Sequence, residues 1–329
     1  MTDHVTAAAP ALQFPRLLRA LPNYRWWRPL LALGLTALFW IVFQVVFGIA
    51  VFVLAILVGD VTFPTVLSVE ALTKVVIAFF SLDTADAFSL VAGLGGVATL
   101  LPAVLLSYRI VGLRPISVLR SVVFRIRWRW LLLSLVPALL ITGVSTVGSI
   151  LVLPALGVGS PVLAPSVPLS TWLVCALIIV ILTPIQAAAE EFAFRGLLVQ
   201  MVGGWVRPTF VAIVVSTAVF AALHTQYELW ATLDVTFFGL VAALLTVRTG
   251  GLESSIALHT VNNTVAFLFL ASGSGGSTTA IDPEHPAQGD PISLLVTLVT
   301  MGAYAAIILV LAHRRGVQRE LPAAVAGNS

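Results

Sequence analysis

Six polar residues lie inside long apolar stretches of the sequence. They are Glu190, Glu191, Arg195, His224, His259 and Asn263. Ionisable groups are costly at membrane depth, so they usually face a cavity and carry function. Carboxylate, imidazole and amide groups can together activate water and stabilise an oxyanion. The chemistry that this set suggests is hydrolysis of a peptide bond.

The two adjacent glutamates are expected to play different parts. Glu191 precedes Arg195 by four residues, the spacing of an ion pair on one helix face. Two neighbouring carboxylates in a low dielectric do not both stay charged easily. We therefore expect Glu191 to pair with Arg195, which leaves Glu190 as the proton acceptor. A purely structural ion-pair cluster at a membrane edge is the alternative.

The two histidines belong to different predicted helices. His224 shares a helix face with Phe220, and Asn263 follows His259 by four residues. Packing near a helix end or hydrogen bonding between helices would explain each of them without catalysis. As a set they suggest more: Glu190 could take a proton from water that His224 helps to hold. His259 and Asn263 could then donate hydrogen bonds to the oxyanion.

The elements that carry these residues are expected to be transmembrane helices. The 329 residues are 59% hydrophobic and only 9% charged, whereas a soluble domain carries about a quarter charged residues. The apolar runs are continuous over about 20 residues, enough for a helix to cross about 30 Å of hydrocarbon. We predict an all-α polytopic membrane protein of about eight transmembrane helices, with a catalytic cavity between the fourth, fifth and seventh. The expected spans are roughly 29–58, 87–108, 131–154, 172–200, 208–225, 229–248, 252–271 and 291–312.

The arginines predict the orientation. With the N-terminus inside, all sixteen arginines fall on the inner half, whereas Lys74 and most acids fall in outer loops. This map admits no span within 61–86. Both termini are therefore expected in the cytoplasm, with the chain integral to the cell membrane.

The segment 12–28, which mixes arginines with Leu, Phe and Trp, is expected to lie on an anionic leaflet as an interfacial helix. A solvated basic tail is the alternative.

Four parts are expected along the chain. Residues 1–28 form a cytoplasmic or interfacial segment, and 29–171 hold three accessory helices. Residues 172–271 form the catalytic membrane core of helices four to seven, and 272–329 hold an outer loop, the last helix and a cytoplasmic tail. Asp234, in the sixth predicted helix, is given no functional role. Nothing in the pattern indicates a nucleic-acid partner or fixes the oligomeric state.

Three motifs in order resemble those of a known family. Members of the CAAX-protease and bacteriocin-processing family, also called the Abi or type II CAAX prenyl endopeptidase family, carry Glu-Glu-x-x-x-Arg, Phe-x-x-x-His and His-x-x-x-Asn on separate transmembrane helices. This chain has these motifs at 190–195, 220–224 and 259–263, and its turn at 248–252 is also similar. The resemblance covers roughly 172–271 and does not extend to the first three predicted spans or the last.

The resemblance implies a membrane-embedded endopeptidase whose cavity opens to the cytoplasm. By position, Glu190 would be the base and His224 its partner, while His259 and Asn263 would form the oxyanion site. The implied substrate is a peptide or a membrane-anchored protein, met within the lipid bilayer. The identity of that substrate is not encoded in the motifs.

Zinc is the cofactor that has to be weighed, because members of this family are often called metalloproteases. Glu190, His224 and His259 could supply three ligands, with water in the fourth place. The sequence has no His-Glu-x-x-His motif, and a glutamate bound to zinc could not act freely as the base. We therefore favour a metal-free mechanism without a cofactor, with zinc as the alternative.

Two other functions compete with a protease. Buried acids and histidines also build the proton relays of ion- or proton-coupled transporters. Such carriers usually show repeated halves with paired broken helices, and we find no internal repeat in the sequence. A catalytically silent membrane scaffold is the other alternative, and the intact Glu, His, His and Asn set argues against it.

Overall fold

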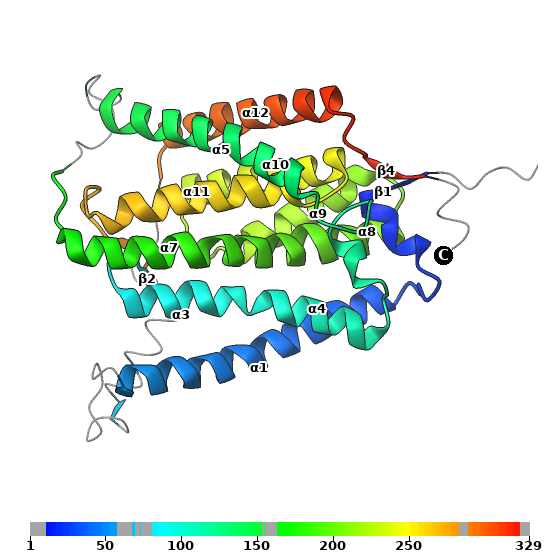
Figure 1. Ribbon diagram of the computed structural model, residues 1–329, viewed down its shortest axis with the longest axis horizontal. Helices are drawn as coiled ribbons and strands as arrows, with labels where there is room; N and C mark the ends of the chain where they lie inside the picture. The colour runs from blue at the N-terminus through cyan, green and yellow to red at the C-terminus, as the bar shows by residue number, and fades with distance from the viewer. Residues whose placement is uncertain are drawn as a thin grey trace, which may run out of the picture.

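The computed structural model describes residues 11–57, 81–152, 163–282 and 289–322, together with isolated residues 68, 69, 73 and 155. Within these ranges the chain is a bundle of helices that run along one common direction (Figure 1). Seven helical segments of the described chain are long and apolar enough to cross a membrane. This confirms the predicted all-α polytopic fold.

The elements follow one another with short connections. In chain order they are β1 (Leu12–Gln13), η1 (Phe14–Ala20), α1 (Arg28–Leu57), β2 (Leu82–Asp83), α3 (Ala87–Ala98), α4 (Leu100–Val111), η3 (Ile116–Leu119), α5 (Trp128–Val147), η4 (Gly148–Val152), α7 (Leu169–Glu190), η5 (Glu191–Leu198), α8 (Val199–Trp205), α9 (Thr209–Ala222), α10 (Leu229–Thr249), α11 (Glu253–Ala271), β3 (Thr279–Ile281), α12 (Pro291–Arg314) and β4 (Glu320–Leu321). Three spans are composite: α3 continues into α4, α5 continues into η4, and α7 continues through η5 into α8.

Seven of the eight predicted spans correspond to these long segments, and the fifth does not. The helix α9 has 14 residues, which is about 21 Å and too short for about 30 Å of hydrocarbon. The prediction of a full span over 208–225 was wrong because the apolar run is itself short and the helix ends at Ala222, before His224 and Thr225. The segment 61–86, predicted to hold no span, falls largely outside the described residues.

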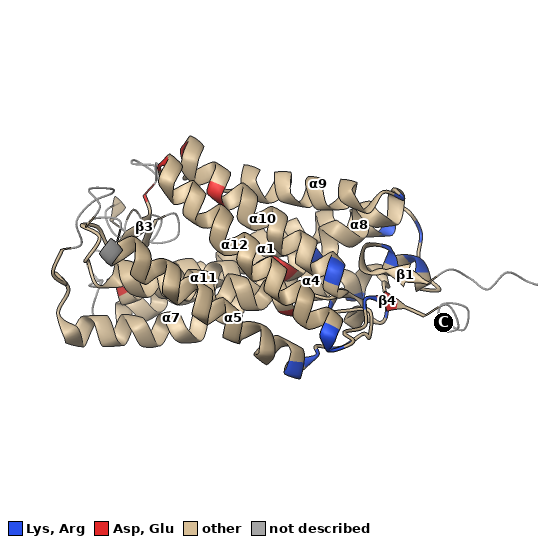
Figure 2. Ribbon diagram, turned by 90° about the horizontal axis from the view of Figure 1, so that it is seen from above, with Lys and Arg blue, Asp and Glu red and all other residues tan. Residues whose placement is uncertain are grey.

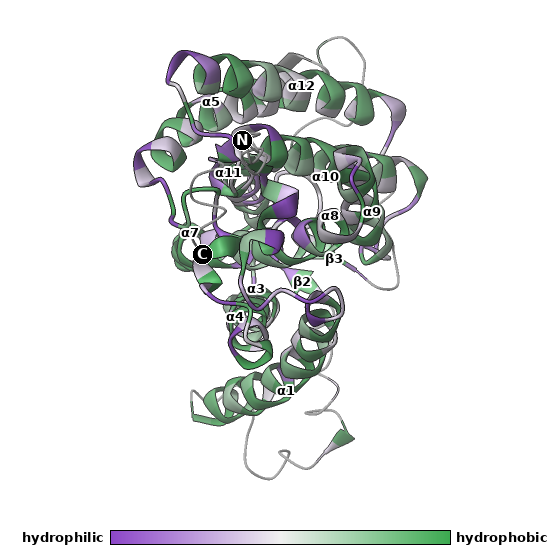
Figure 3. Ribbon diagram, turned by 90° about the vertical axis from the view of Figure 1, so that its right-hand side faces the viewer, coloured by the Kyte–Doolittle hydropathy of each residue, from purple (hydrophilic) through white to green (hydrophobic). Residues whose placement is uncertain are grey.

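The helix α11 lies in the middle of the bundle. It packs against α5, α7 and α10 (Figure 1), and its residues from Glu253 to His259 are all buried. Apolar side chains of α1, α5 and α7 are instead exposed to the surroundings, and hydrophobic residues predominate on the outer helices (Figure 3). Lipid therefore faces the periphery, while α11 is enclosed by protein.

The two ends of the bundle differ in charge. The arginines gather at one end (Figure 2), where β1 pairs antiparallel with β4. The antiparallel pair of β2 and β3 lies at the other end. We call these the arginine end and the β2–β3 end. Because β1 and β4 are paired, both described ends of the chain lie at the arginine end, as the charge pattern predicted.

An ion pair at the arginine end fixes the start of α11. Arg127 Nη2 lies 2.6 Å from Glu253 Oε2, and Arg127 Nη1 donates to the carbonyl oxygens of Thr249 and Gln318. Gly250 ends α10 with a φ of +70°, a left-handed conformation that glycine adopts without steric cost. Arg127 thus joins the end of α10, the start of α11 and the segment after α12 at the turn that leads into the third motif.

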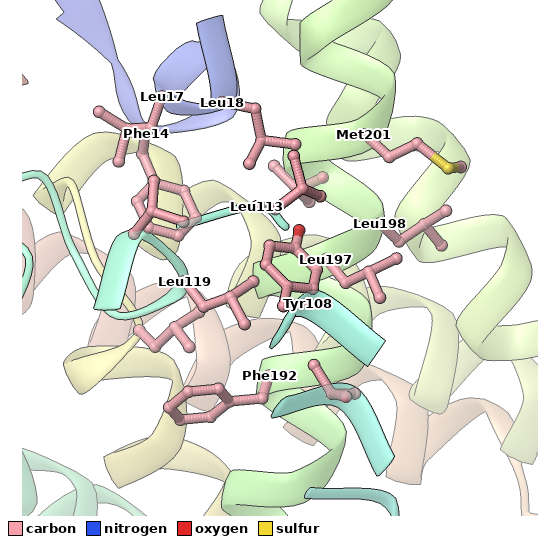
Figure 4. Close-up of a cluster of buried hydrophobic side chains, with 14 of the residues drawn as sticks. Phe14, Leu17, Leu18, Tyr108, Leu113, Leu119, Phe192, Leu197, Leu198 and Met201 are labelled. Atoms are coloured by element: carbon pink, nitrogen blue, oxygen red, sulfur yellow. The ribbon is translucent and has the colours of Figure 1, made fainter. Parts of the chain in front are cut away.

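The N-terminal segment packs into protein rather than onto lipid. Its helix η1 is a seven-residue 3-10 helix whose Phe14, Leu17 and Leu18 are fully buried. Figure 4 shows them in one cluster with Leu113 and side chains of η5 and α8. The interfacial helix predicted over 12–28 is therefore wrong for these apolar residues, because α8 and the loop after α4 cover them.

Candidate active site

The predicted site residues converge on one cavity. Glu190, His224, His259 and Asn263 all line a space of about 390 Å³. They come from α7, from α11 and from the segment that follows α9. The sequence analysis predicted that these three parts of the chain line one cavity. The predicted convergence is therefore present. A volume of this size falls at the lower end of the range usual for ligand pockets.

The boundary between an α-helix and a π-helix falls between the two adjacent glutamates. The α-helix α7 ends at Glu190, and the π-helix η5 begins at Glu191. Such wider turns are rare and often occur at functional sites. The side chain of Glu190 is 13% exposed, whereas that of Glu191 is fully buried. The two carboxylates thus sit in different environments, one lining the cavity and one within the protein.

The buried carboxylate is paired as the four-residue spacing predicted. Arg195 Nη1 lies 3.2 Å from Glu191 Oε1, and both side chains are fully buried. Arg195 Nη2 donates to the carbonyl oxygen of Gly239 at 3.4 Å, and the guanidinium carbon lies 4.1 Å from the centroid of the Phe220 ring. The arginine is held by an anion, a carbonyl group and an aromatic face, so Glu191 is fixed as a carboxylate.

His259 joins the two carboxylates. Its Nδ1 lies 2.9 Å from Glu191 Oε1 and its Nε2 lies 3.4 Å from Glu190 Oε2. A carboxylate only accepts hydrogen bonds, so Nδ1 carries a hydrogen and donates it to Glu191. Nε2 is therefore the ring nitrogen that faces Glu190. Phe238 packs edge-on against the ring at a centroid distance of 4.9 Å and restricts its orientation.

His224 is anchored differently from the sequence expectation. Its Nδ1 lies 2.7 Å from the carbonyl oxygen of Phe220, and because a carbonyl only accepts, Nδ1 is the donor. The Leu223 amide donates to the same carbonyl oxygen at the end of α9, and the ring bond leaves His224 Nε2 available as an acceptor. The histidine in ion-pair contact with Glu190 is His259. This contact forms because α11 lies directly beside α7, and the expectation that His224 helps to hold the water stays a prediction.

Asn263 is tied to α7 through an amide contact. Its Nδ2 donates to Gln186 Oε1 at 3.3 Å, and Asn262 Nδ2 donates to Asn263 Oδ1 at 3.3 Å. Gln186 lies four residues before Glu190 and lines the same cavity. The sequence placed Gln186 on the stripe of Glu190 but gave it no role. Its contact sets the position of the Asn263 amide relative to Glu190.

Two further lining residues had no clear signal in the sequence. Tyr227 stacks on His224 with ring centroids 5.9 Å apart, and Phe238 packs on His259. Burial raises the pKa of Tyr227, and the charge of Glu190 adds to the effect. Its phenol therefore keeps its proton and can donate a hydrogen bond. Aromatic residues in an apolar sequence are common, which is why neither residue stood out.

The three residues named as alternative zinc ligands do not gather into a ligand set in this geometry. Among the described residues, no three His, Cys, Asp or Glu side chains lie closely enough together to hold a metal ion. Glu190 and His259 are adjacent, and the Nδ1 of each histidine faces a protein acceptor, which leaves Nε2 as its free ring nitrogen. Zinc stays the alternative to the metal-free mechanism that we favour.

The cavity extends from Glu190 toward the β2–β3 end. Its partly exposed lining residues there are Ser81, Gln226, Ala280 and Ile281. Arginine is absent from the described lining. The described lining thus reaches the β2–β3 end and does not reach the arginine end. The resemblance implied a cavity open to the cytoplasm, the side on which the charge pattern places the arginine end, and the side of the opening stays a prediction.

Comparisons with known proteins bear on the same segment. Residues 169–265 match the family model described as type II CAAX prenyl endopeptidase Rce1-like. The uncharacterized protein YyaK of Bacillus subtilis (strain 168) is 35% identical over 106 residues, which are 30% of this chain and 34% of that protein. The match thus spans about a third of that relative's length. No solved structure shows significant similarity to the chain. The family model thus matches the segment that builds the cavity, which confirms the family resemblance seen in the three motifs.

Proposed function

We propose that this chain is an intramembrane endopeptidase in which Glu190 activates water for attack on a peptide bond. The observation that carries the proposal is the position of Glu190. It lines the cavity and touches His259, whose other ring nitrogen is fixed by the buried pair of Glu191 and Arg195. A general base needs access to water and a partner that holds it in place. The family match over 169–265 supports a protease.

The proposed reaction uses one water molecule. Glu190 takes a proton from water as the water oxygen attacks the peptide carbonyl carbon. With that proton on Glu190, the Nε2–H of His259 is free to donate to the oxyanion. Asn263 Nδ2 is the second proposed donor, and such a donor is worth about 3–4 kcal/mol where water is excluded. When the C–N bond breaks, Glu190 returns the proton to the leaving amine.

The proposed setting is the cell membrane, with the arginine end in the cytoplasm. Arginines in short loops favour the cytoplasmic side, and those of this chain gather at one end (Figure 2). Because the described lining of the cavity reaches the β2–β3 end, we place the entry of the substrate on the non-cytoplasmic side. This replaces the cytoplasmic opening that the resemblance implied. The proposed substrate is a peptide or a membrane-anchored protein that presents an extended segment there.

Cysteine labelling tests this orientation. In a Cys175→Ala background, Thr225→Cys places a thiol beside the cavity mouth and Ser117→Cys places one at the arginine end. An impermeant maleimide added to intact cells should label Thr225→Cys but not Ser117→Cys, and both should react after permeabilisation. Labelling of Ser117→Cys from outside, with Thr225→Cys protected, would reverse the orientation.

Peptide cleavage before and after metal removal tests the reaction itself. The purified chain in lipid nanodiscs should cleave members of a peptide library, read by mass spectrometry, and should keep its rate after exhaustive chelation. No cleavage of any peptide would contradict the protease and would favour a carrier or a scaffold. Activity lost on chelation and restored by zinc, with zinc content lost in His224→Ala, would contradict the metal-free mechanism.

A further inference from the structure

A second carboxylate lines the proposed catalytic cavity. Asp234 lies in the second turn of α10, near the β2–β3 end and about 8 Å along the helix axis from Leu229. It lines the same cavity as Glu190. Its Oδ1 is buried and has no hydrogen-bond partner among the described residues. The hydroxyl groups of Ser293 and Thr297 on α12 lie beside the carboxylate.

The two acids of the cavity differ in charge balance. Glu190 is in contact with His259, whereas Asp234 forms no salt bridge within the described chain. The described lining contains neither lysine nor arginine, and Asp234 is flanked in it by apolar groups such as Val235 and Met301. A carboxylate in apolar surroundings is unfavourable without a partner. The described lining therefore offers Asp234 no lysine or arginine as a partner.

We propose that Asp234 determines specificity by receiving a cationic group of the substrate, the side chain of a lysine or an arginine. The proposal rests on the proposed function, because it places the substrate in the cavity of Glu190. The cavity runs from Glu190 toward the end that carries Asp234. An extended peptide held at Glu190 therefore passes Asp234 on its way out. The cation would lie on the mouth side of the scissile bond.

A structural role for Asp234 makes a different prediction. Hydroxyl groups of Ser293 and Thr297 could tie α10 to α12 through this side chain. An asparagine would accept such bonds equally well, and a tie of this kind leaves the buried Oδ1 unexplained. The isosteric Asp234→Asn variant therefore separates the two roles, since it keeps the shape and removes only the charge.

The test compares matched peptides on the full chain in lipid nanodiscs. A library peptide that is cleaved is resynthesised with each lysine or arginine replaced in turn by norleucine. At one position we expect the norleucine peptide to lose about 10- to 100-fold in kcat/KM, the usual worth of a hydrogen bond to a charged group. This ratio should fall to near unity in Asp234→Asn and persist in Asp234→Glu. It should also persist in Glu228→Gln, which removes an exposed acid near the same end that does not line the cavity.

Three outcomes would overturn the proposal. In the first, the wild type cleaves the peptide with the cation and its norleucine counterpart at the same rate. In the second, Asp234→Asn keeps the full wild-type preference for the cation. In the third, Asp234→Asn lowers kcat/KM equally for both peptides. The first comparison needs no variant, so it decides the matter even if Asp234→Asn does not fold. Failure of the proposed function looks different: the wild type then cleaves no peptide, or Glu190→Gln cleaves as fast as the wild type.

Discussion

Replacement of Glu190 by glutamine is expected to abolish peptide cleavage while the protein stays folded. Glutamine keeps the shape of the side chain but cannot take a proton from water, and a general base contributes about 10²–10⁴ in rate. The side chain lines the cavity rather than the packed core, so the fold should tolerate the change. We expect kcat/KM to drop at least about 10²-fold, with a thermal unfolding midpoint close to that of the wild type.

Glu228→Gln is the matched control for this variant. It makes the same chemical change at an exposed glutamate outside the cavity, and it should leave both cleavage and unfolding unchanged. A Glu190→Gln protein that retained cleavage close to the wild-type rate would rule out Glu190 as the base. A variant that lost cleavage only because it unfolded would show a lowered midpoint.

Replacement of Arg195 by methionine is expected to cause a large loss of stability. Methionine can still pack against Phe220, but Glu191 would be left as a fully buried carboxylate without its cation. Removing one partner of a buried pair costs about 3–5 kcal/mol. The measured quantity is the free energy of unfolding, obtained by denaturant titration in mixed micelles. The control is Arg207→Met, which replaces an exposed arginine at the arginine end. It should change the free energy of unfolding by less than about 0.5 kcal/mol.

A second substitution tests the cause of that loss. Adding Glu191→Gln to Arg195→Met removes the unpaired charge, so part of the lost stability should return. Glutamine can still accept the hydrogen bond from His259 Nδ1 through its amide oxygen. A double variant as unstable as Arg195→Met alone would mean that packing of the arginine, and not the ion pair, stabilises this part of the bundle.

The fold was largely predictable because lipid imposes one strong rule. Continuous apolar runs had to be helices, and the long ones are. The helix α9 escaped the rule because its apolar run, which ends at Leu223, is too short to cross the hydrocarbon. At its end the His224 ring donates to the Phe220 carbonyl oxygen, a contact that hydropathy does not encode.

The members of the candidate site were predictable from local spacing, and their contacts were predictable only in part. The pair of Glu191 and Arg195 follows from one helix and a four-residue interval. The contact of His259 with Glu190 depends on how α11 packs against α7 and on the π-helix that begins at Glu191. No spacing rule within one segment describes such a contact between two helices.

The direction of the cavity was also beyond the sequence. Charge counts indicate which end of the bundle faces the cytoplasm, but not where a space between helices opens. That depends on residues far apart in the chain, such as Ser81, Gln226 and Ile281, which meet at the β2–β3 end. The resemblance supplied an expectation for the opening, and the arrangement of β2 and β3 around the mouth points the other way.

The central claim is that Glu190, held in this cavity, activates water to hydrolyse a peptide bond. Mass spectrometry of peptides incubated with the purified chain in nanodiscs and oxygen-18 water tests it most directly. At each cleavage by the wild type, the account predicts one oxygen-18 atom in the new C-terminal carboxylate of the N-terminal fragment and none in the other fragment, and no product from Glu190→Gln prepared in the same way. Equal cleavage by the Glu190→Gln preparation, or no cleavage of any peptide by the wild type, would contradict it.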